Sequence, residues 1–256
     1  MNKPCLSAVL IVKNEGELLG ACLEKLRWAD EIIVLDSGSS DNTLDVARQF
    51  TSHVYVDADW QGFGVQRQRA QAKANGDWIL MVDADEHVTD ELKHAIQQVV
   101  MQNDQAKVYE VPRLSWCFGG FIRHSGWYPD YNVRLYPKQV GHYGSERVHE
   151  KLNYAKAVEV MRLKGDLLHY TYRDLEHYLV KSAQYAKEWA KQRAGQGKST
   201  NLISGVLHGM GCFVKMYLLR AGFLDGRQGF LLAVLSAHST FVKYADLWIR
   251  TKTSVR

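Results

Sequence analysis

Three carboxylates crowd together directly after one hydrophobic run. The stretch LMVDADEHV, residues 80–88, contains Asp83, Asp85 and Glu86 within four positions. Like charges this close repel one another, so the pattern indicates a cation that offsets the repulsion. Asp83 and Asp85 lie two positions apart, which places both on one side of an extended segment, and carboxylate oxygens suit Mg²⁺ or Mn²⁺. A solvated acidic turn leading to a helix capped by Thr89 would use the same residues without a metal.

Two more polar clusters follow short apolar runs. Asn14 and Glu15 come after the run 6–12, and Asp36 ends the run 32–35. A carboxylate at the position of Asp36 can accept a hydrogen bond from a nucleobase imide or from a ribose hydroxyl. The Gly- and Ser-rich sequence after it also fits a hydrogen-bonded turn, so a structural role is the alternative.

The elements that must position these clusters alternate regularly. Period and length predict strands at 6–12, 32–35, 54–56 and 78–82, and helices at 17–26, 44–50, 66–74 and 89–100. Strands alternating with helices at this spacing predict βαβ units and a mostly parallel sheet with helices on both faces. Because ligands of such sheets bind beyond the carboxyl ends of the strands, the three clusters are expected to converge on one cleft.

The pattern changes after residue 107. Short strands are predicted at 108–114 and 132–136 and around 148–152, which extends the sheet in antiparallel or mixed fashion. Helices are predicted at 175–194, 202–221 and 230–250. We therefore expect an α/β domain over residues 1–170 and a C-terminal helical extension over 171–256.

Composition excludes several classes of protein. The 256 residues are 46% hydrophobic and 23% charged, which is typical of a globular chain, and a net charge of +4 is too weak to indicate nucleic-acid binding. The four cysteines form no Cys-x-x-Cys pair, which favours a reduced cytoplasmic setting over a zinc or disulfide framework. The N-terminus leads straight into the run 6–12 without the basic, apolar and small-residue regions of a signal peptide, so none is expected. The longest uncharged runs fall short of the roughly 20 apolar residues that span a bilayer, so no membrane-spanning helix is expected either.

The motifs together resemble one family. LIVKNE at 10–15, IIVLDSGSSDNT at 32–43, GDWILMVDADE at 76–86 and RVHEKL at 147–152 are similar in order and spacing to family 2 glycosyltransferases. The resemblance covers roughly residues 5–170. It implies the GT-A fold, a Rossmann-like mixed, mostly parallel sheet flanked by helices, and inverting transfer from a nucleotide-diphosphate sugar. GWYPDYNVRLYPK at 126–138 and residues 218–244 resemble the bacterial β-1,4-glucosyltransferases that build the lipopolysaccharide inner core.

The resemblance also implies roles for individual residues. It places Asp36 at the nucleobase, Asp83 near the ribose and Asp85, in an Asp-x-Asp motif, on a divalent cation that bridges the diphosphate. His169 is expected at the metal or the diphosphate, although a histidine bonded within the core is the alternative. Many family members have a second Asp after the position of Asp36, and here it is Ser37.

Three more residues complete the expected donor site. Asn14 and Glu15 belong to it because they follow a strand whose carboxyl end faces the cleft. Arg69, on the helix before the acidic strand, is expected to pair with phosphate, and a solvated or ion-paired surface role is the alternative.

An inverting transfer needs a base that deprotonates the acceptor hydroxyl as it attacks the sugar. Glu150 in RVHEKL is the first choice, because it follows the second part of the sheet, where the acidic base of the family usually lies. Asp130 and Glu146 are the rivals.

The resemblance thus implies a metal-dependent glycosyltransferase that takes glucose from UDP-glucose and adds it to a heptose of the lipopolysaccharide inner core. An exopolysaccharide or peptide acceptor is the nearer alternative, and a metal-dependent phosphohydrolase using Asp83 is a more distant one.

Apolar positions with interspersed Lys and Arg in residues 202–250 fit a helical core, the interface of a homo-oligomer or a helix lying on a bilayer. We expect peripheral association with the cytoplasmic face of a bacterial inner membrane.

Overall fold

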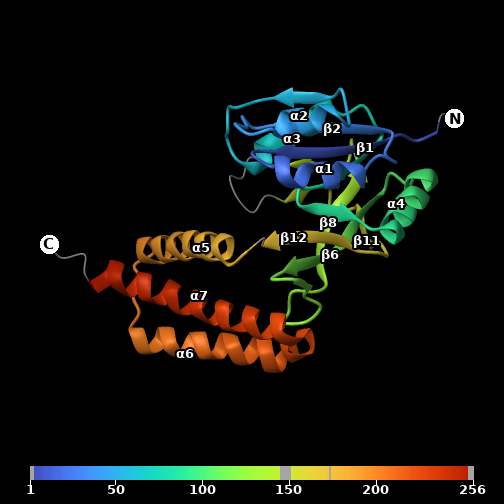
Figure 1. Ribbon diagram of the computed structural model, residues 1–256. Coiled ribbons are helices and arrows are strands. Elements are labelled where there is room, and N and C mark those ends of the chain that lie inside the picture. Colours follow the sequence, from blue (N-terminus) through green and yellow to red (C-terminus); the bar gives the residue numbers. More distant parts are fainter. Residues whose placement is uncertain (1–2, 145–150, 173, 253–256) are drawn as a thin grey trace. The chain divides into compact units, whose positions relative to one another are not determined.

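The computed structural model describes residues 3–144, 151–172 and 174–252 and divides them into two compact units (Figure 1). The sheet unit comprises Met1–Arg113 and Asp130–His169, and the helical unit comprises Leu114–Pro129 and Tyr170–Arg256. The sequence predicted a domain boundary after residue 170, and in the structure the chain passes from the sheet unit to the helical unit between His169 and Tyr170. The segment Leu114–Pro129, which the sequence left with the first domain, joins the helical unit.

The sheet unit begins with four parallel strands, as the alternating pattern predicts. Their pairing order is β3-β2-β1-β4, and each pair runs parallel. The elements of this region are β1 (Leu6–Val12), α1 (Gly16–Glu24), β2 (Glu31–Asp36), α2 (Thr43–Arg48), β3 (Val54–Val56), α3 (Phe63–Lys73), β4 (Trp78–Met81), β5 (Glu86–Val88) and α4 (Asp90–Gln102).

Antiparallel pairing extends the sheet beyond β4. The order continues β8-β6-β12-β5, in which β8 runs antiparallel to both β4 and β6, and β12 runs antiparallel to β5. The sheet is therefore mixed, which confirms the predicted fold class. The elements are β6 (Lys107–Cys117), β7 (Gly120–Phe121), β8 (Asp130–Pro137), β9 (His142–Tyr143), β10 (Leu152–Asn153), β11 (Glu159–Arg162) and β12 (Leu167–Tyr172).

Alternation along the strands divides the core into two layers. Leu10 of β1 and Leu80 of β4 face one layer with helices α1, α2 and α4, whereas Val9 and Met81 face the other with α3. Successive side chains of a strand point to opposite faces, so runs that are apolar throughout require helices on both. This packing fixes the carboxyl ends of β1, β2 and β4 at one edge of the sheet.

Thr89 caps helix α4 just after the acidic residues. Its hydroxyl accepts a hydrogen bond from the Leu92 amide at 3.4 Å and donates to the Asp166 carbonyl at 2.8 Å. We expect Thr89→Ala to lower the free energy of unfolding by about 1 kcal/mol, because an N-cap and a tertiary bond are lost together. Urea unfolding measures this effect, and Thr89→Ser, which keeps the hydroxyl, should restore most of it. Equal losses for both variants would contradict the cap.

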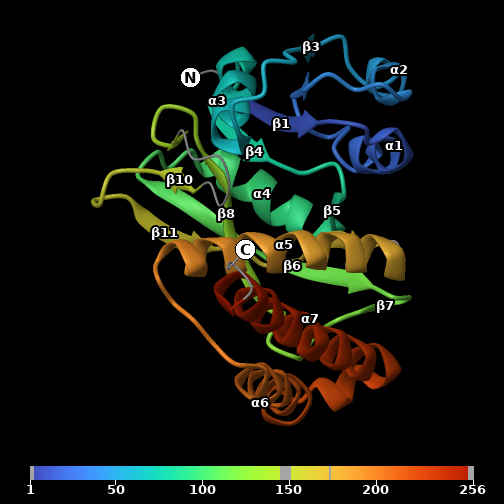
Figure 2. The same cartoon turned by 90° about the vertical axis from the view of Figure 1, so that its left-hand side faces the viewer.

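The helical unit contains α5 (Leu175–Gly195), α6 (Leu202–Phe213) and α7 (Gly226–Lys252). Helix α7 packs against both others and lies between them in both views (Figures 1 and 2). The sequence predicted one helix over 202–221, but α6 passes into a π-helical segment, Val214–Leu219, and then a 3₁₀ turn, Gly222–Asp225. Helix α7 begins four residues earlier than expected, at Gly226, whose φ of 63° ends the 3₁₀ turn.

One helical stretch of the described chain, Leu202–Leu219, is long and apolar enough by length and composition to cross a membrane. The sequence did not predict it, because Lys215 interrupts the uncharged run. The structure continues the helix through that residue. A single stretch of this kind does not establish a span, since core helices of soluble proteins pass the same test.

Candidate active site

The chain reverses immediately after β4, and this reversal presents the three carboxylates. The Glu86 amide donates to the Asp83 carbonyl at 3.0 Å, and the Asp83 amide donates to a Glu86 carboxylate oxygen at the same distance. Strand β5 then begins at Glu86, whose side chain is fully buried. We call residues 82–86 the acidic turn.

Guanidinium groups neutralise two of the three carboxylates. Arg67 of α3 donates to Asp83 Oδ1 at 2.7 Å, and Arg134 of β8 donates to Asp83 Oδ2 at 2.7 Å and to Glu86 Oε1 at 2.6 Å. Arg113 of β6 lies 3.8 Å from the same Glu86 oxygen. The cation that the crowded carboxylates require is therefore, for Asp83 and Glu86, a cluster of arginine side chains.

The two neutralised carboxyl groups differ in their acidity. Burial opposes ionisation of Asp83, but Arg134 and Arg67 together hold its pKa well below the ordinary value. For Glu86, burial and the neighbouring Asp83 charge outweigh the attraction of Arg134 and raise the pKa. Asp83 is thus a fixed anion, whereas Glu86 gains a proton more readily than an ordinary glutamate.

Asp85 is the carboxylate of the acidic turn that faces a different partner. Its Oδ2 lies 3.2 Å from Nε2 of His169, which extends from β12, and 27% of its side chain is exposed. The register of β12 with β5 brings these two together, because His169 pairs with Glu86. A carboxylate and an imidazole, both partly open to solvent, are a donor set that a divalent cation accepts.

The loops after β1 and β2 are bonded to one another. The Asn14 amide donates to Ser39 Oγ at 2.8 Å, and the Asn14 side-chain oxygen accepts from the Ser40 amide at 2.8 Å. The Glu15 amide donates to the Thr43 hydroxyl at 2.8 Å. Two of the three predicted clusters therefore do meet at the carboxyl edge of the sheet.

Asp36 is fully buried and serves its own turn. Its Oδ1 accepts from the amides of Gly38 and Ser39 at 2.8 Å each, and its Oδ2 accepts from the Ser39 hydroxyl. This is the hydrogen-bonded turn that the Gly- and Ser-rich sequence also allowed. Recognition of a nucleobase by Asp36 stays a prediction.

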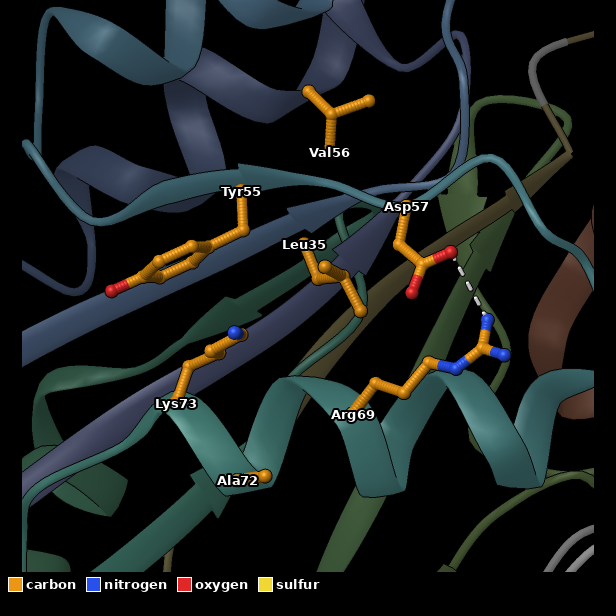
Figure 3. Close-up of a pocket in the computed structure, with 7 residues that line it drawn as sticks. All are labelled: Leu35, Tyr55, Val56, Asp57, Arg69, Ala72 and Lys73. Atoms are coloured by element: carbon orange, nitrogen blue, oxygen red, sulfur yellow. Dashed lines mark hydrogen bonds and ion pairs between the residues drawn. The ribbon is translucent and has the colours of Figure 1, made fainter.

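Arg69 lies at the outer edge of the parallel strands, in a shallow pocket of about 310 Å³ between α3 and strands β2 and β3. It donates to Asp57 Oδ1 at 3.1 Å and to Asp59 Oδ2 at 2.9 Å, and Figure 3 shows it reaching from α3 toward Asp57. The ammonium group of Lys73 sits 5.1 Å from the centre of the Tyr55 ring in the same pocket. In the structure Arg69 is therefore an ion-paired residue, which was the alternative to phosphate binding.

Of the two residues predicted as bases, only Asp130 belongs to the described chain. It begins β8 opposite Arg113, whose Nη2 donates to Asp130 Oδ2 at 2.6 Å. Glu150, together with its rival Glu146, lies outside the described residues. The choice between Glu150 and Asp130 stays a prediction.

Sequence reasoning missed the arginine cluster. It singled out Arg69 on α3, but Arg67 contacts the acidic turn. A weak signal was present, because Arg67 precedes Ala70 and Ala74 at helical spacing, and all three are buried. An arginine on the buried side of a helix normally has an anionic partner.

The mixed, mostly parallel sheet with helices on both faces has the GT-A fold. Among solved structures, Staphylococcus aureus TarS, residues 1–349 in complex with UDP, is 15% identical with a TM-score of 0.50, over 97% of this chain and 91% of that one. The model of glycosyl transferase family 2 matches residues 7–155, and the chain belongs to that family.

Two relatives match over nearly the whole chain. An uncharacterized glycosyltransferase of Rickettsia prowazekii is 26% identical over 94% of this chain and 86% of its own length. The lipopolysaccharide core biosynthesis glycosyltransferase LpsC of Rhizobium meliloti is 26% identical over 98% of this chain and 94% of its own length. These matches extend through the helical unit, so the likeness is not confined to the sheet unit.

Proposed function

We propose that this glycosyltransferase moves a hexose, with glucose from UDP-glucose as the favoured donor, onto a heptose of the lipopolysaccharide inner core with inversion of the sugar. One observation supports the nucleotide-sugar donor in this proposal. Asp85 pairs with His169, whereas the nearby Asp83 is already neutralised by two arginines. The likeness to LpsC over 94% of that protein supports the acceptor half. The choice of glucose and heptose follows from the family resemblance.

Asp85 and His169 would hold a divalent cation, Mn²⁺ or Mg²⁺. The described residues contain no group of three or more His, Cys, Asp or Glu side chains arranged to hold a metal. Two protein ligands would suffice for a cation whose remaining ligands are oxygens of the donor diphosphate. When bound, such a cation stabilises the negative charge that develops on the departing nucleoside diphosphate.

The arginine cluster would keep the donor side of the site rigid. Asp83 is held from two sides, so it can accept a hydrogen bond from a sugar hydroxyl without changing position. Neutralising Asp83 and Glu86 also lowers the repulsion that a diphosphate would meet at this edge. Asn14, Glu15 and Asp36 would shape the adjoining nucleotide site through the bonded loops after β1 and β2.

Calorimetric titration with UDP, GDP and their sugar conjugates, first with Mn²⁺ and then with EDTA, tests the donor assignment. Binding of UDP and UDP-glucose that EDTA removes is the expected result, because Asp85 and His169 would hold a cation that offsets the charge of the diphosphate. A protein that binds none of these nucleotides under either condition would refute the proposal. Preference for GDP would correct the donor and leave the class of reaction intact.

Separate substitutions distinguish the two carboxylates predicted as base. Glu150→Gln should leave UDP-glucose binding intact and lower transfer about 10²- to 10⁴-fold, because a general base typically contributes that much. Asp130→Asn should keep most of the activity if Asp130 only pairs with Arg113. Steady-state transfer and donor titration of both variants measure this. The opposite result, with Asp130→Asn inactive and Glu150→Gln active, would move the base to Asp130.

We place the reaction at the cytoplasmic face of the inner membrane. An acceptor built on a lipid anchor is confined to a membrane surface, and a nucleotide-sugar donor is available on the cytoplasmic side. This proposal requires the protein to bind the membrane, and exposed apolar side chains of the helical unit are suited to that.

A further inference from the structure

The outward face of helix α6 and of the turns after it is apolar and exposed. We call this set the apolar face: Leu202, Ile203, Val206, Leu207, Met210, Val214, Leu218, Leu219, Phe223 and Leu224. Ile203 and Leu219 are its most exposed members, at 72% and 76%. Helices on the surface of a globular protein normally present polar side chains outward, so this face requires a partner.

The opposite side of α6 already has its partner within the unit. A side chain at Gly205 would meet Tyr244 and Phe241 of α7, and one at Gly209 would meet the Ala237 carbonyl, so these glycines let the two helices approach closely. By the 3.6-residue period of the helix, Ile203, Leu207 and Met210 lie roughly a third to a half of a turn away from the glycines. The contact with α7 therefore leaves it uncovered.

The part of the sequence that contains the apolar face is strongly basic. Residues 189–245 contain seven Lys or Arg, namely Lys191, Arg193, Lys198, Lys215, Arg220, Arg227 and Lys243, and one acidic residue, Asp225. The side chain of Asp225 is 4% exposed and accepts bonds from the amides of Arg123 and His124. With 32 basic and 28 acidic residues in the whole chain, the remaining sequence carries 25 basic and 27 acidic ones. The net positive charge of the protein therefore resides in this segment.

We propose that the apolar face binds an anionic lipid bilayer, lying in its interface while Lys215, Arg220 and Arg227 contact the headgroups. A second copy of the chain would also cover apolar side chains, but it would bring like charges together. An anionic surface is complementary to both the apolar and the basic groups. The inference deepens the proposed function by naming the surface that brings the enzyme to its acceptor.

The arrangement of the three helices favours a position in the interface over a span. The 18 residues Leu202–Leu219 would measure about 27 Å as a continuous α-helix, close to the hydrocarbon thickness. Helix α7, however, packs against α6 on one side and α5 on the other, and α5 carries six charged side chains. Immersing α6 and α7 would draw α5 toward the hydrocarbon, whereas shallow insertion of the apolar face leaves it in water.

Sedimentation with vesicles tests the proposal directly. The full chain should co-sediment with vesicles of equal parts phosphatidylcholine and phosphatidylglycerol, and less with phosphatidylcholine alone. The double variant Ile203→Glu, Leu219→Glu should lose about tenfold or more of this binding, because each change places a carboxylate against lipid. Met101→Glu on α4 is the matched control, since Met101 is also an exposed apolar helical residue, at 59%.

Removing basic charge should weaken binding in a separate way. The double variant Lys215→Gln, Arg227→Gln should bind anionic vesicles about 25-fold more weakly, at about fivefold for each charge near the surface. High salt should reduce wild-type binding and have less effect on this variant. Extraction by salt or carbonate should release the wild-type protein from membranes, whereas resistance to both would indicate a span and overturn the interfacial placement.

Two outcomes would refute the lipid assignment. One is a wild-type protein that binds neither kind of vesicle. The other is a wild-type dimer, seen by light scattering, that Ile203→Glu, Leu219→Glu converts to a monomer without any change in vesicle binding. Neither measurement uses donor or acceptor, so a failure here is distinguishable from a failure of the proposed transfer reaction, which donor titration detects.

Discussion

Replacing Asp85 with Ala is expected to abolish cation-dependent binding of UDP-glucose and to lower turnover by at least about 100-fold. Asp85 is the carboxylate of the acidic turn that no arginine of the described chain neutralises, and it lies 3.2 Å from His169. Its removal would leave one imidazole to hold the cation that neutralises the leaving diphosphate. Titration of UDP-glucose with and without Mn²⁺, followed by steady-state turnover, measures both effects.

His169→Ala should reproduce most of this loss, and the double variant should lose little more than either single one, since both side chains serve one site. Asp90→Ala is the control, because Asp90 is an exposed carboxylate five residues further on, in the first turn of α4. If Asp85→Ala binds UDP-glucose with the metal dependence of the wild type, the assignment of Asp85 is wrong. Additive losses at Asp85 and His169 would show that the two act separately.

The sequence predicted the parallel half of the sheet because its strands are buried on both faces. Runs such as 6–12 and 78–82 have few polar residues, and their length and the helices between them indicate parallel pairing. The place of Asn14, Asp36 and Asp83 at one edge follows from that topology alone. This part of the site is therefore predictable without knowledge of any side-chain contact.

The contacts within the site were less accessible to sequence reasoning. The crowded carboxylates correctly indicated positive charge, but not that Arg67 and Arg134, 16 and 51 residues from Asp83, supply it. The position of Arg134 depends on the antiparallel register of β8 with β4, and that of Arg67 on how α3 packs against the sheet, and no local pattern encodes either one. The sequence likewise could not show that both oxygens of Asp36 are used within its own turn.

The C-terminal helices illustrate a different limit. Periodicity identified apolar positions such as Val206 and Met210, but a core, a dimer interface and a lipid surface all show the same spacing. The structure separates these positions from Gly205 and Gly209, which face α7, and so shows which side lacks a partner. Burial, rather than periodicity, distinguishes the alternatives.

Replacing Arg134 with Met should lower the free energy of unfolding by about 3–5 kcal/mol, because it leaves the fully buried carboxylate of Glu86 without its nearest cation and takes one of two arginines from Asp83. Arg134 is 7% exposed and bonds to both Asp83 and Glu86. After the change, Asp83 retains Arg67, whereas Glu86 retains the Asp83 amide at 3.0 Å and, as its nearest arginine in the described chain, Arg113 at 3.8 Å. Urea unfolding followed by circular dichroism measures the loss, and Arg134→Lys should fall between Met and the wild type.

The pH dependence distinguishes lost charge pairing from lost packing. The pKa of Asp83 lies below its ordinary 3.8 in the folded protein, so its contribution is fully present above that value and is lost as the pH falls below it. The pKa of Glu86 is already raised, and without Arg134 it should rise further, so protonation of Glu86 relieves the variant as the pH falls. The loss of unfolding free energy in Arg134→Met should therefore become smaller as the pH falls from about 7 to about 4.

A second substitution tests the same explanation. Adding Glu86→Gln to Arg134→Met should recover part of the stability at neutral pH, because it removes the buried carboxylate that the loss of Arg134 affects most. A deficit that is independent of pH and unaffected by Glu86→Gln would mean that Arg134 stabilises the sheet unit by packing alone.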